Sequence, residues 1–191
     1  MNLFKIFISA FLIDNVVLMR FLALCPFIGM STDEDKSIGM GLAVTFVTVL
    51  ATAVTWPLYR FILEPHDLVF LRTLTFILVI ASLVQLVEFY LKKMAPGLYG
   101  AMGIYLALIT TNCAILAVTF DVISNGYNFL ESLVYALGVA LGFMLSLLLL
   151  AGIRRRIRTS PIPPFLKGTP ILFVAAALLS LAFTGFKGLV K

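Results

Sequence analysis

The two cysteines, Cys25 and Cys113, are the side chains of this sequence whose type and placement most clearly suggest chemistry. Each lies in an apolar stretch beside residues that favour a helix break: Pro26 follows the first, and the polar run Thr110-Thr111-Asn112 precedes the second. Irregular backbone at membrane depth persists only where protein or a cavity satisfies it, and it commonly marks a site. As thiolates, both cysteines could bind a metal.

A metal site on these cysteines would be incomplete within one chain. Iron–sulfur clusters and structural zinc usually need about four ligands, and the only histidine, His66, lies in a polar break between apolar runs. Two further thiolates would have to come from another chain, which predicts a half-site at a subunit interface. The alternatives are that Cys25 and Cys113 are small buried apolar residues beside threonines that bond to their own helix, or that they form a disulfide.

Two charged residues, Asp14 and Arg20, interrupt the first apolar run. They are six positions apart, so they are not stacked neighbours on one helix face. Charge inside a bilayer is costly, and such residues usually face the protein interior or pair with one another. The sequence leaves two interpretations open: a role in an ion path, or pairing of Arg20 with an acid on another helix or subunit.

Weaker signals lie elsewhere in the apolar runs. Glu88 and Glu131 fall near predicted helix ends, where an interfacial role is expected. Gly138 and Gly142 form a G-x-x-x-G pair, which predicts a close approach of two helices. Gly39-Met40-Gly41 lies inside an apolar run, so it is not a dinucleotide-binding loop between a strand and a helix.

The elements that must position these residues are membrane helices. Of the 191 residues, 62% are hydrophobic and 12% are charged, whereas a soluble domain is about half apolar and about a quarter charged. The runs are too long and too uniformly apolar for alternating β-barrel strands, and each is near the ~20 residues that cross a bilayer as a helix. The six predicted runs are Leu3–Met30, Ser37–Tyr59, Leu68–Leu91, Leu98–Phe120, Asn128–Gly152 and Thr169–Phe186.

The distribution of Lys and Arg predicts the orientation. The loops after the first, third and fifth runs carry Lys36, Lys92, Lys93, Arg154, Arg155, Arg156, Arg158 and Lys167. The opposite side, with both termini, carries Lys5, Arg60, Arg72, Lys187 and Lys191. The richer side is predicted to be cytoplasmic and both termini external. Basic residues placed in short loops orient a membrane protein, so we do not expect a nucleic-acid partner.

The first run, interrupted by Asp14 and without a clear cleavage site, is predicted to be a retained helix rather than a signal peptide.

Pro96-Gly97 divides this single six-helix domain (residues 1–191) into two halves of three apolar runs, residues 1–96 and 97–191. Three crossings per half would give the halves opposite orientations, as in inverted repeats. Phe21-Leu22-Ala23-Leu24 in the first run also resembles Tyr105-Leu106-Ala107-Leu108 in the fourth, and a cysteine follows each. The predicted fold is therefore an all-α membrane protein whose six helices form two inverted three-helix repeats, with the first and fourth helices broken near the cysteines.

Motifs along the whole chain resemble the RnfA/NqrE family of membrane subunits, RnfA more closely than NqrE. The matching segments are Leu24-Cys25-Pro26-Phe27 with Gly29, Leu71-Arg72-Thr73-Leu74 with Phe76-Ile77-Leu78-Val79-Ile80, Leu108-Ile109-Thr110-Thr111-Asn112-Cys113-Ala114, and Leu181-Ala182-Phe183 with Gly185-Phe186. One departure is Asp14-Asn15, where the family pattern would have two amides.

The resemblance implies a site and partners. In the family, an RnfA subunit pairs with an RnfE paralogue of opposite topology, and the two hold an iron–sulfur cluster between their cysteines within the membrane. Carried over, Cys25 and Cys113 would be two of four ligands of a [2Fe–2S] cluster. The complex passes electrons between ferredoxin and NAD and moves Na+ or H+ across the bacterial inner membrane. Flavins and the other iron–sulfur clusters would belong to partner subunits, RnfB, RnfC, RnfD and RnfG among them.

A secondary transporter is the alternative from another class, because transporters also combine inverted repeats with broken helices. Such a protein would hold no chromophore, and its cysteines would be structural. Iron and acid-labile sulfide in the purified assembly would distinguish the two functions.

Overall fold

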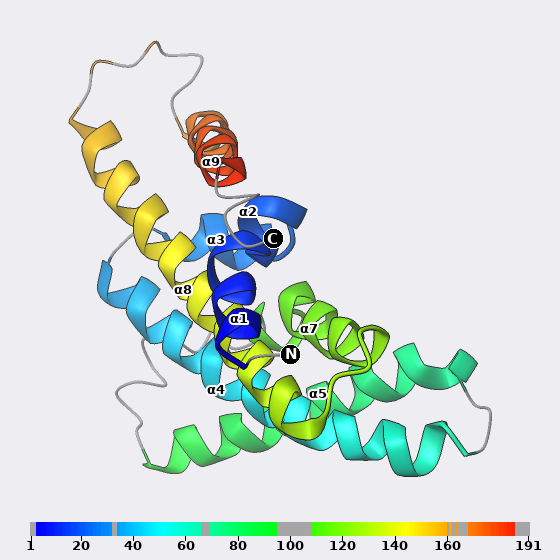
Figure 1. Cartoon of the computed structure of the whole chain (residues 1–191). Coiled ribbons are helices and arrows are strands. Elements are labelled where there is room, and N and C mark those ends of the chain that lie inside the picture. Colours follow the sequence, from blue (N-terminus) through cyan, green and yellow to red (C-terminus); the bar gives the residue numbers. More distant parts are fainter. Residues whose placement is uncertain are drawn as a thin grey trace.

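The computed structural model describes residues 3–31, 34–65, 69–94, 108–159, 161, 163 and 168–185, and every regular element within them is helical (Figure 1). The α-helices are α1 (Leu3–Ile8), α2 (Val16–Arg20), α3 (Leu24–Met30), α4 (Glu34–Leu58), α5 (Arg72–Met94), α7 (Cys113–Ser124), α8 (Phe129–Arg158) and α9 (Thr169–Thr184). Two π-helical turns, η1 (Ser9–Ile13) and η2 (Tyr59–Leu63), and one 3-10 turn, η3 (Val69–Leu71), extend them.

Among the described residues, three helices are long and apolar enough to cross a membrane: Ser37–Leu63, Arg72–Tyr90 and Phe129–Arg158. They coincide with the second, third and fifth predicted runs. Two shorter apolar helices, Leu3–Ile13 and Thr169–Thr184, fall within the first and sixth runs, and a third, Leu108–Ser124, overlaps the fourth and extends beyond its predicted end. The prediction of an all-helical membrane protein is confirmed, and the count of six crossings stays a prediction. The boundary at Pro96-Gly97, Tyr105-Leu106-Ala107, His66 and Lys167 lie outside the described residues.

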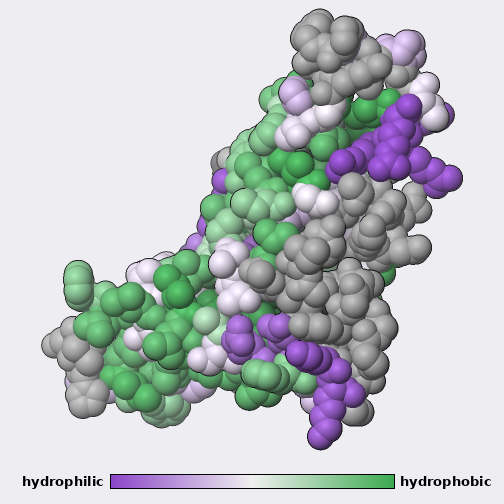
Figure 2. Space-filling view, turned by 180° about the vertical axis from the view of Figure 1, so that it is seen from behind, coloured by the Kyte–Doolittle hydropathy of each residue, from purple (hydrophilic) through white to green (hydrophobic). Residues whose placement is uncertain are grey.

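The ends of the long helices segregate in space. The N-terminal end of α4 and the C-terminal ends of α5 and α8 lie on the left of Figure 1, whereas the C-terminal end of α4 and the N-terminal end of α5 lie on the right. The last turns of α5 and α8 are basic, with Lys92 and Lys93 on one and Arg155, Arg156 and Arg158 on the other. In Figure 2, seen from behind, the two large hydrophilic patches lie on one side and hydrophobic surface covers much of the rest.

The crossing of α4 and α8 forms the centre of the fold, and small side chains make it tight. A methyl group at Gly41 of α4 would lie 2.5 Å from Cγ of Met144 in α8. Buried Thr48, Thr52 and Thr55 donate their hydroxyl protons to carbonyls four residues earlier in α4, so each of these hydroxyl donors is paired within its own helix. Close packing of this kind drives helix association in lipid, where apolar burial contributes little.

The G-x-x-x-G pair of α8 packs against the first helix, as the sequence predicted. A methyl group at Gly138 would lie 2.9 Å from Cβ of Ala10, and one at Gly142 would lie 2.7 Å from the carbonyl oxygen of Phe11. The second clash is with backbone, which cannot rotate away. These glycines therefore fix how closely α1 and η1 lie against α8.

Candidate redox site at two helix breaks

The first predicted helix is broken twice. A first break at Asp14 and Asn15 separates η1 from α2, and a second at Phe21–Ala23 separates α2 from α3. Phe21 (φ 52°) and Ala23 (φ 59°) are left-handed, a conformation that side-chain-bearing residues rarely adopt. Such residues cost on the order of 1–3 kcal/mol each and cluster at functional sites.

The predicted break of the first helix near Cys25 is confirmed, but it lies at Phe21–Ala23 and not at the Cys25-Pro26 step. Pro26 is the third residue of α3, which begins at Leu24 with Ala23 as its N-cap. Proline is tolerated in a first helical turn, where its missing N–H has no intrahelical acceptor to lose. The chain therefore breaks before Cys25 rather than after it, and the cysteine becomes the second residue of the new helix.

Cys113 also opens a helix. It is the first residue of α7, and the buried Asn112 that precedes it is the N-cap, whose side-chain oxygen accepts a hydrogen bond from the N–H of Ala114 (3.0 Å). The helical segment before it ends at Thr110, and Thr111 forms a turn. Asparagine favours this position because its side chain satisfies an N–H that the helix leaves free.

One hydrogen bond joins the two breaks. The backbone N–H of Ala23 donates to Sγ of Cys113 at 2.8 Å, across 90 positions of sequence. Both cysteines are exposed, and neither forms a disulfide. Each thiol thus lies in the first turn of a helix, where the free N–H groups and the positive end of the helix dipole favour negative charge. The hydrogen bond therefore brings the break before Cys25 into contact with Cys113.

The donor set at this region fits half of a four-thiolate cluster. Within the described part of the chain, no group of three or more His, Cys, Asp or Glu side chains could hold a metal. Cys25 and Cys113 therefore have no third ligand among these residues, and their exposure leaves them open to thiolates from outside the chain.

The chain matches the family described as "Rnf-Nqr subunit, membrane protein" over residues 3–190. The chain belongs to this Rnf-Nqr family. Its relatives include the subunits designated A of ion-translocating oxidoreductase complexes. It is 52% identical over 189 residues to that of Syntrophotalea carbinolica, covering 99% of this chain and 98% of the relative. It is 51% identical, with the same coverage, to that of the Na(+)-translocating ferredoxin:NAD(+) oxidoreductase complex of Acetobacterium woodii. The corresponding protein of Cereibacter sphaeroides is 51% identical over 98% of this chain and 97% of its own length. The resemblance read from the sequence is confirmed.

In this Rnf-Nqr chain, Arg20 pairs with an acid on another helix rather than with Asp14. Its Nη1 lies 2.6 Å from Oδ2 of Asp121 in α7, and the hydroxyl of Tyr135 in α8 donates to the same oxygen at 3.1 Å. Asp14 instead accepts a hydrogen bond from the hydroxyl of Ser9 (3.3 Å). Because Arg20 immediately precedes the Phe21–Ala23 break, the ion pair ties that break to the helix of Cys113.

Carboxylates gather at one end of this bundle. Burial raises the pKa of the Tyr127 phenol, and the charges of Asp14, Glu131 and Asp121 raise it further. Glu131 also completes the N-terminal cap of α8, since its carboxylate accepts the N–H of Asn128 at 3.1 Å. Glu131 therefore lies at a helix end, as predicted, and its interfacial role stays a prediction.

Sequence reasoning missed two residues that position the site. Asn15 caps α2 and donates from Nδ2 to the carbonyl of Gly142 and the hydroxyl of Ser146, both at 2.8 Å. An asparagine just before an apolar run is a recognisable capping signal. Arg154 donates to the carbonyl of Ile28 (3.1 Å) and the hydroxyl of Ser31 (3.2 Å), at the C-terminal end of α3. No local signal distinguishes Arg154 from its basic neighbours.

Proposed function

We propose that this chain is an electron-carrying membrane subunit of an ion-translocating ferredoxin:NAD oxidoreductase complex, in which Cys25 and Cys113 supply two of the four ligands of an intramembrane [2Fe–2S] cluster. The observation that carries the proposal is the hydrogen bond from the N–H of Ala23 to Sγ of Cys113, because it joins the N-cap of the helix that carries Cys25 to the other cysteine. Family membership and the names of the relatives support the complex.

The remaining two thiolates come from a partner, an RnfE-like paralogue of opposite topology. Two exposed thiols without a third ligand in the described residues are what such a shared site requires. The other cofactors, flavins and further iron–sulfur clusters, belong to other subunits of the complex. The translocated ion is Na+ or H+, and the name of the Acetobacterium woodii relative favours Na+.

The residues around the thiols suit a negatively charged, one-electron carrier, which is the chemistry that a [2Fe–2S] cluster supplies. The N–H of Ala23 stabilises electron density on the sulfur of Cys113, and the first turns of α3 and α7 present further N–H groups and positive dipole ends. Arg154 holds the C-terminal end of α3, and the Arg20–Asp121 pair joins α2, which precedes the break, to α7.

Two inverted repeats and a basic cytoplasmic face complete the proposal. Asn15 (φ −60°, ψ 111°) and Asn112 (φ −70°, ψ 111°) cap one helix in each half with nearly the same backbone conformation, which supports a structural repeat. The cysteines themselves are not equivalent in this comparison, because Cys113 directly follows its cap and Cys25 belongs to a later helix.

Reporter fusions after Arg158 should read cytoplasmic and fusions after Lys191 external; the same reading from both would contradict six crossings.

Substitution of either cysteine tests the cluster. Cys25→Ser and Cys113→Ser should each abolish the intramembrane iron–sulfur signal and ferredoxin:NAD turnover, because a hydroxyl replaces a thiolate ligand. Assembly should survive, since serine is close in size. Iron content, acid-labile sulfide and electron paramagnetic resonance of the purified complex are the measurements. Wild-type turnover in an assembled variant would contradict the ligand role and would make the two cysteines structural residues. Absence of iron and acid-labile sulfide from the wild-type assembly would favour the secondary transporter, which the broken helices also suit.

A further inference from the structure

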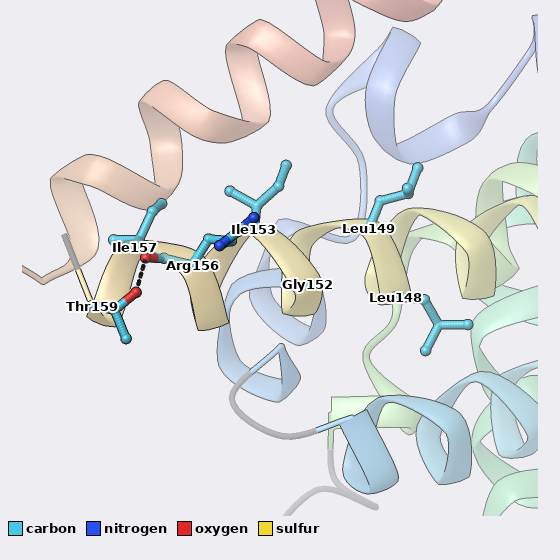
Figure 3. Close-up of a pocket in the computed structure, with 7 residues that line it drawn as sticks. All are labelled: Leu148, Leu149, Gly152, Ile153, Arg156, Ile157 and Thr159. Carbon is cyan, nitrogen blue, oxygen red and sulfur yellow. Dashed lines mark hydrogen bonds between the residues drawn. The ribbon is translucent and has the colours of Figure 1, made fainter.

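A groove opens at the basic end of α8 (Figure 3). It has a volume of about 690 Å³, and its lining includes Leu148, Leu149, Gly152, Ile153 and Arg156. A second cavity of about 330 Å³ adjoins it and is lined mainly by apolar residues of α9. Ile153 and Ile157 border both cavities, so the two lie on either side of one ridge on α8.

Gly152 in the lining of this groove has no packing role within the described structure. A methyl group there would meet no atom within 4 Å, in contrast to the clashes at Gly138 and Gly142 of the same helix. A glycine inside a helix costs about 1 kcal/mol relative to alanine. Bare backbone at Gly152 therefore points to an occupant from outside the chain that lies against α8.

The groove changes character along its length. Arg156 lines one end, and in Figure 3 its side chain runs back along α8 toward Ile153. Leu148 and Leu149 lie eight and seven positions earlier, which is roughly 10–12 Å deeper along a helix. Among the described residues, Arg156 has no ion-pair partner. The occupant should therefore be anionic at the membrane surface and apolar below it.

We propose that this groove binds an anionic phospholipid. The phosphate accepts hydrogen bonds from the Arg156 guanidinium, whose planar fork suits phosphate oxygens. One acyl chain lies over Gly152 and Leu149, and the second lies beyond the Ile153–Ile157 ridge, against α9. Basic pockets between membrane helices are typical binding sites for anionic headgroups. The two adjoining cavities match a ligand with two chains and one charged head.

The test uses the assembled complex in lipid nanodiscs that contain a photoactivatable phosphatidylglycerol with its reactive group on an acyl chain. Labelled peptides should map to residues 148–157 and 171–182. Arg156→Gln should lower the labelling about tenfold, the loss expected for a charge-assisted hydrogen bond. Gly152→Leu, which fills the groove and keeps the charge, should lower it as well. Arg158→Gln is the matched control, because it removes the same charge from the same turn but does not line the groove.

Three outcomes would overturn the proposal. Equal loss of labelling in Arg158→Gln and Arg156→Gln would mean diffuse attraction to a basic surface. Equal labelling by a phosphatidylcholine probe would mean that the headgroup is not recognised. Absence of labelling, together with cross-linking of Gly152→Cys to another subunit, would mean that a protein covers the groove. Size-exclusion profiles of each variant establish that the complex is assembled before labelling is compared.

Discussion

Asn15 and Asn112 show how the same side chain caps a helix in two different environments. The oxygen of each accepts N–H groups at a helix start. The Nδ2 group of Asn15 donates to Gly142 and Ser146, whereas the buried Nδ2 of Asn112 has no hydrogen-bond partner among the described residues. A buried donor without an acceptor costs free energy that a satisfied one does not.

This difference predicts unequal costs for one substitution. Asn15→Ala should destabilise the chain by about 2 kcal/mol, because it loses a cap and two interhelical hydrogen bonds. Asn112→Ala should cost about 1 kcal/mol or less, because loss of the cap is offset by removal of an unpaired donor. Unfolding of the detergent-solubilised chain followed by circular dichroism compares the two. A larger loss in Asn112→Ala would indicate that its Nδ2 group has an important partner in the assembled protein.

Substitution of Asp121 should reduce the stability of the protein more than substitution of Arg20, the arginine that it pairs with. Its Oδ2 accepts hydrogen bonds from both Arg20 and Tyr135, so Asp121→Asn weakens two contacts and Arg20→Gln only one. Because Arg20 is substantially exposed, its own contribution should be at most about 1 kcal/mol. A double-mutant cycle on thermal unfolding of the complex measures the coupling, with Tyr135→Phe as the reference for the second contact. Equal effects of Asp121→Asn and Arg20→Gln would mean that the hydrogen bond from Tyr135 to Asp121 does not contribute to stability.

Among the helices, α8 organises the fold through two kinds of glycine. Gly138 and Gly142 allow the first helix to pack closely against α8, whereas Gly152 faces open space in the groove. Arg154, one turn before Arg158 in the basic end of α8, holds the C-terminal end of α3. One long helix therefore positions the first helix and, through α3, the cysteine at its start.

The two kinds of glycine predict opposite responses to the same substitution. Gly142→Ala should separate η1 from α8 and destabilise the chain by about 1–3 kcal/mol, because its methyl group would clash with the backbone carbonyl of Phe11. Gly152→Ala should be neutral or stabilise α8 by up to about 1 kcal/mol, since the methyl group enters open space. Thermal unfolding and the yield of assembled complex measure both variants. Similar losses of stability in Gly142→Ala and Gly152→Ala would contradict the close approach of η1 to α8 at Gly142.

The molecule as a whole is one part of a larger assembly. Its two exposed thiols are the residues that we propose as half of a ligand set, and much of its remaining surface is apolar (Figure 2). Large exposed side chains such as Leu74, Leu78 and Phe89 line α5, which lies at the edge of the bundle. Lipid and partner subunits must cover these surfaces.

The half-site predicts that the chain expressed alone is colourless. Co-expression with an oppositely oriented paralogue should restore visible iron–sulfur absorption, because the partner supplies the two missing thiolates. The two purified preparations are compared by absorption, iron content and electron paramagnetic resonance after reduction. A stoichiometric cluster in the chain alone would refute the heteromeric site and favour a homodimer. A paralogue pair without a cluster would make Cys25 and Cys113 small structural residues.

Composition and motifs were enough to establish the helical membrane class, the apolar runs, the family and the two cysteines as the residues of interest. These features are local or cumulative: hydropathy acts on each segment separately, and the motifs are contiguous. The close approach at Gly138 and Gly142 was also predictable, because small residues at a spacing of four share one helix face.

Where the first helix breaks, and what holds the break, followed only from the folded chain. Pro26 favoured a break after Cys25, but the chain turns at the left-handed Phe21 and Ala23, whose conformations have no local sequence signal. The contact between Ala23 and Cys113, the pairing of Arg20 with Asp121 and the bonds of Arg154 all join segments 90 or more residues apart. Such contacts depend on how the helices pack, and packing is a property of the whole chain that no single segment encodes.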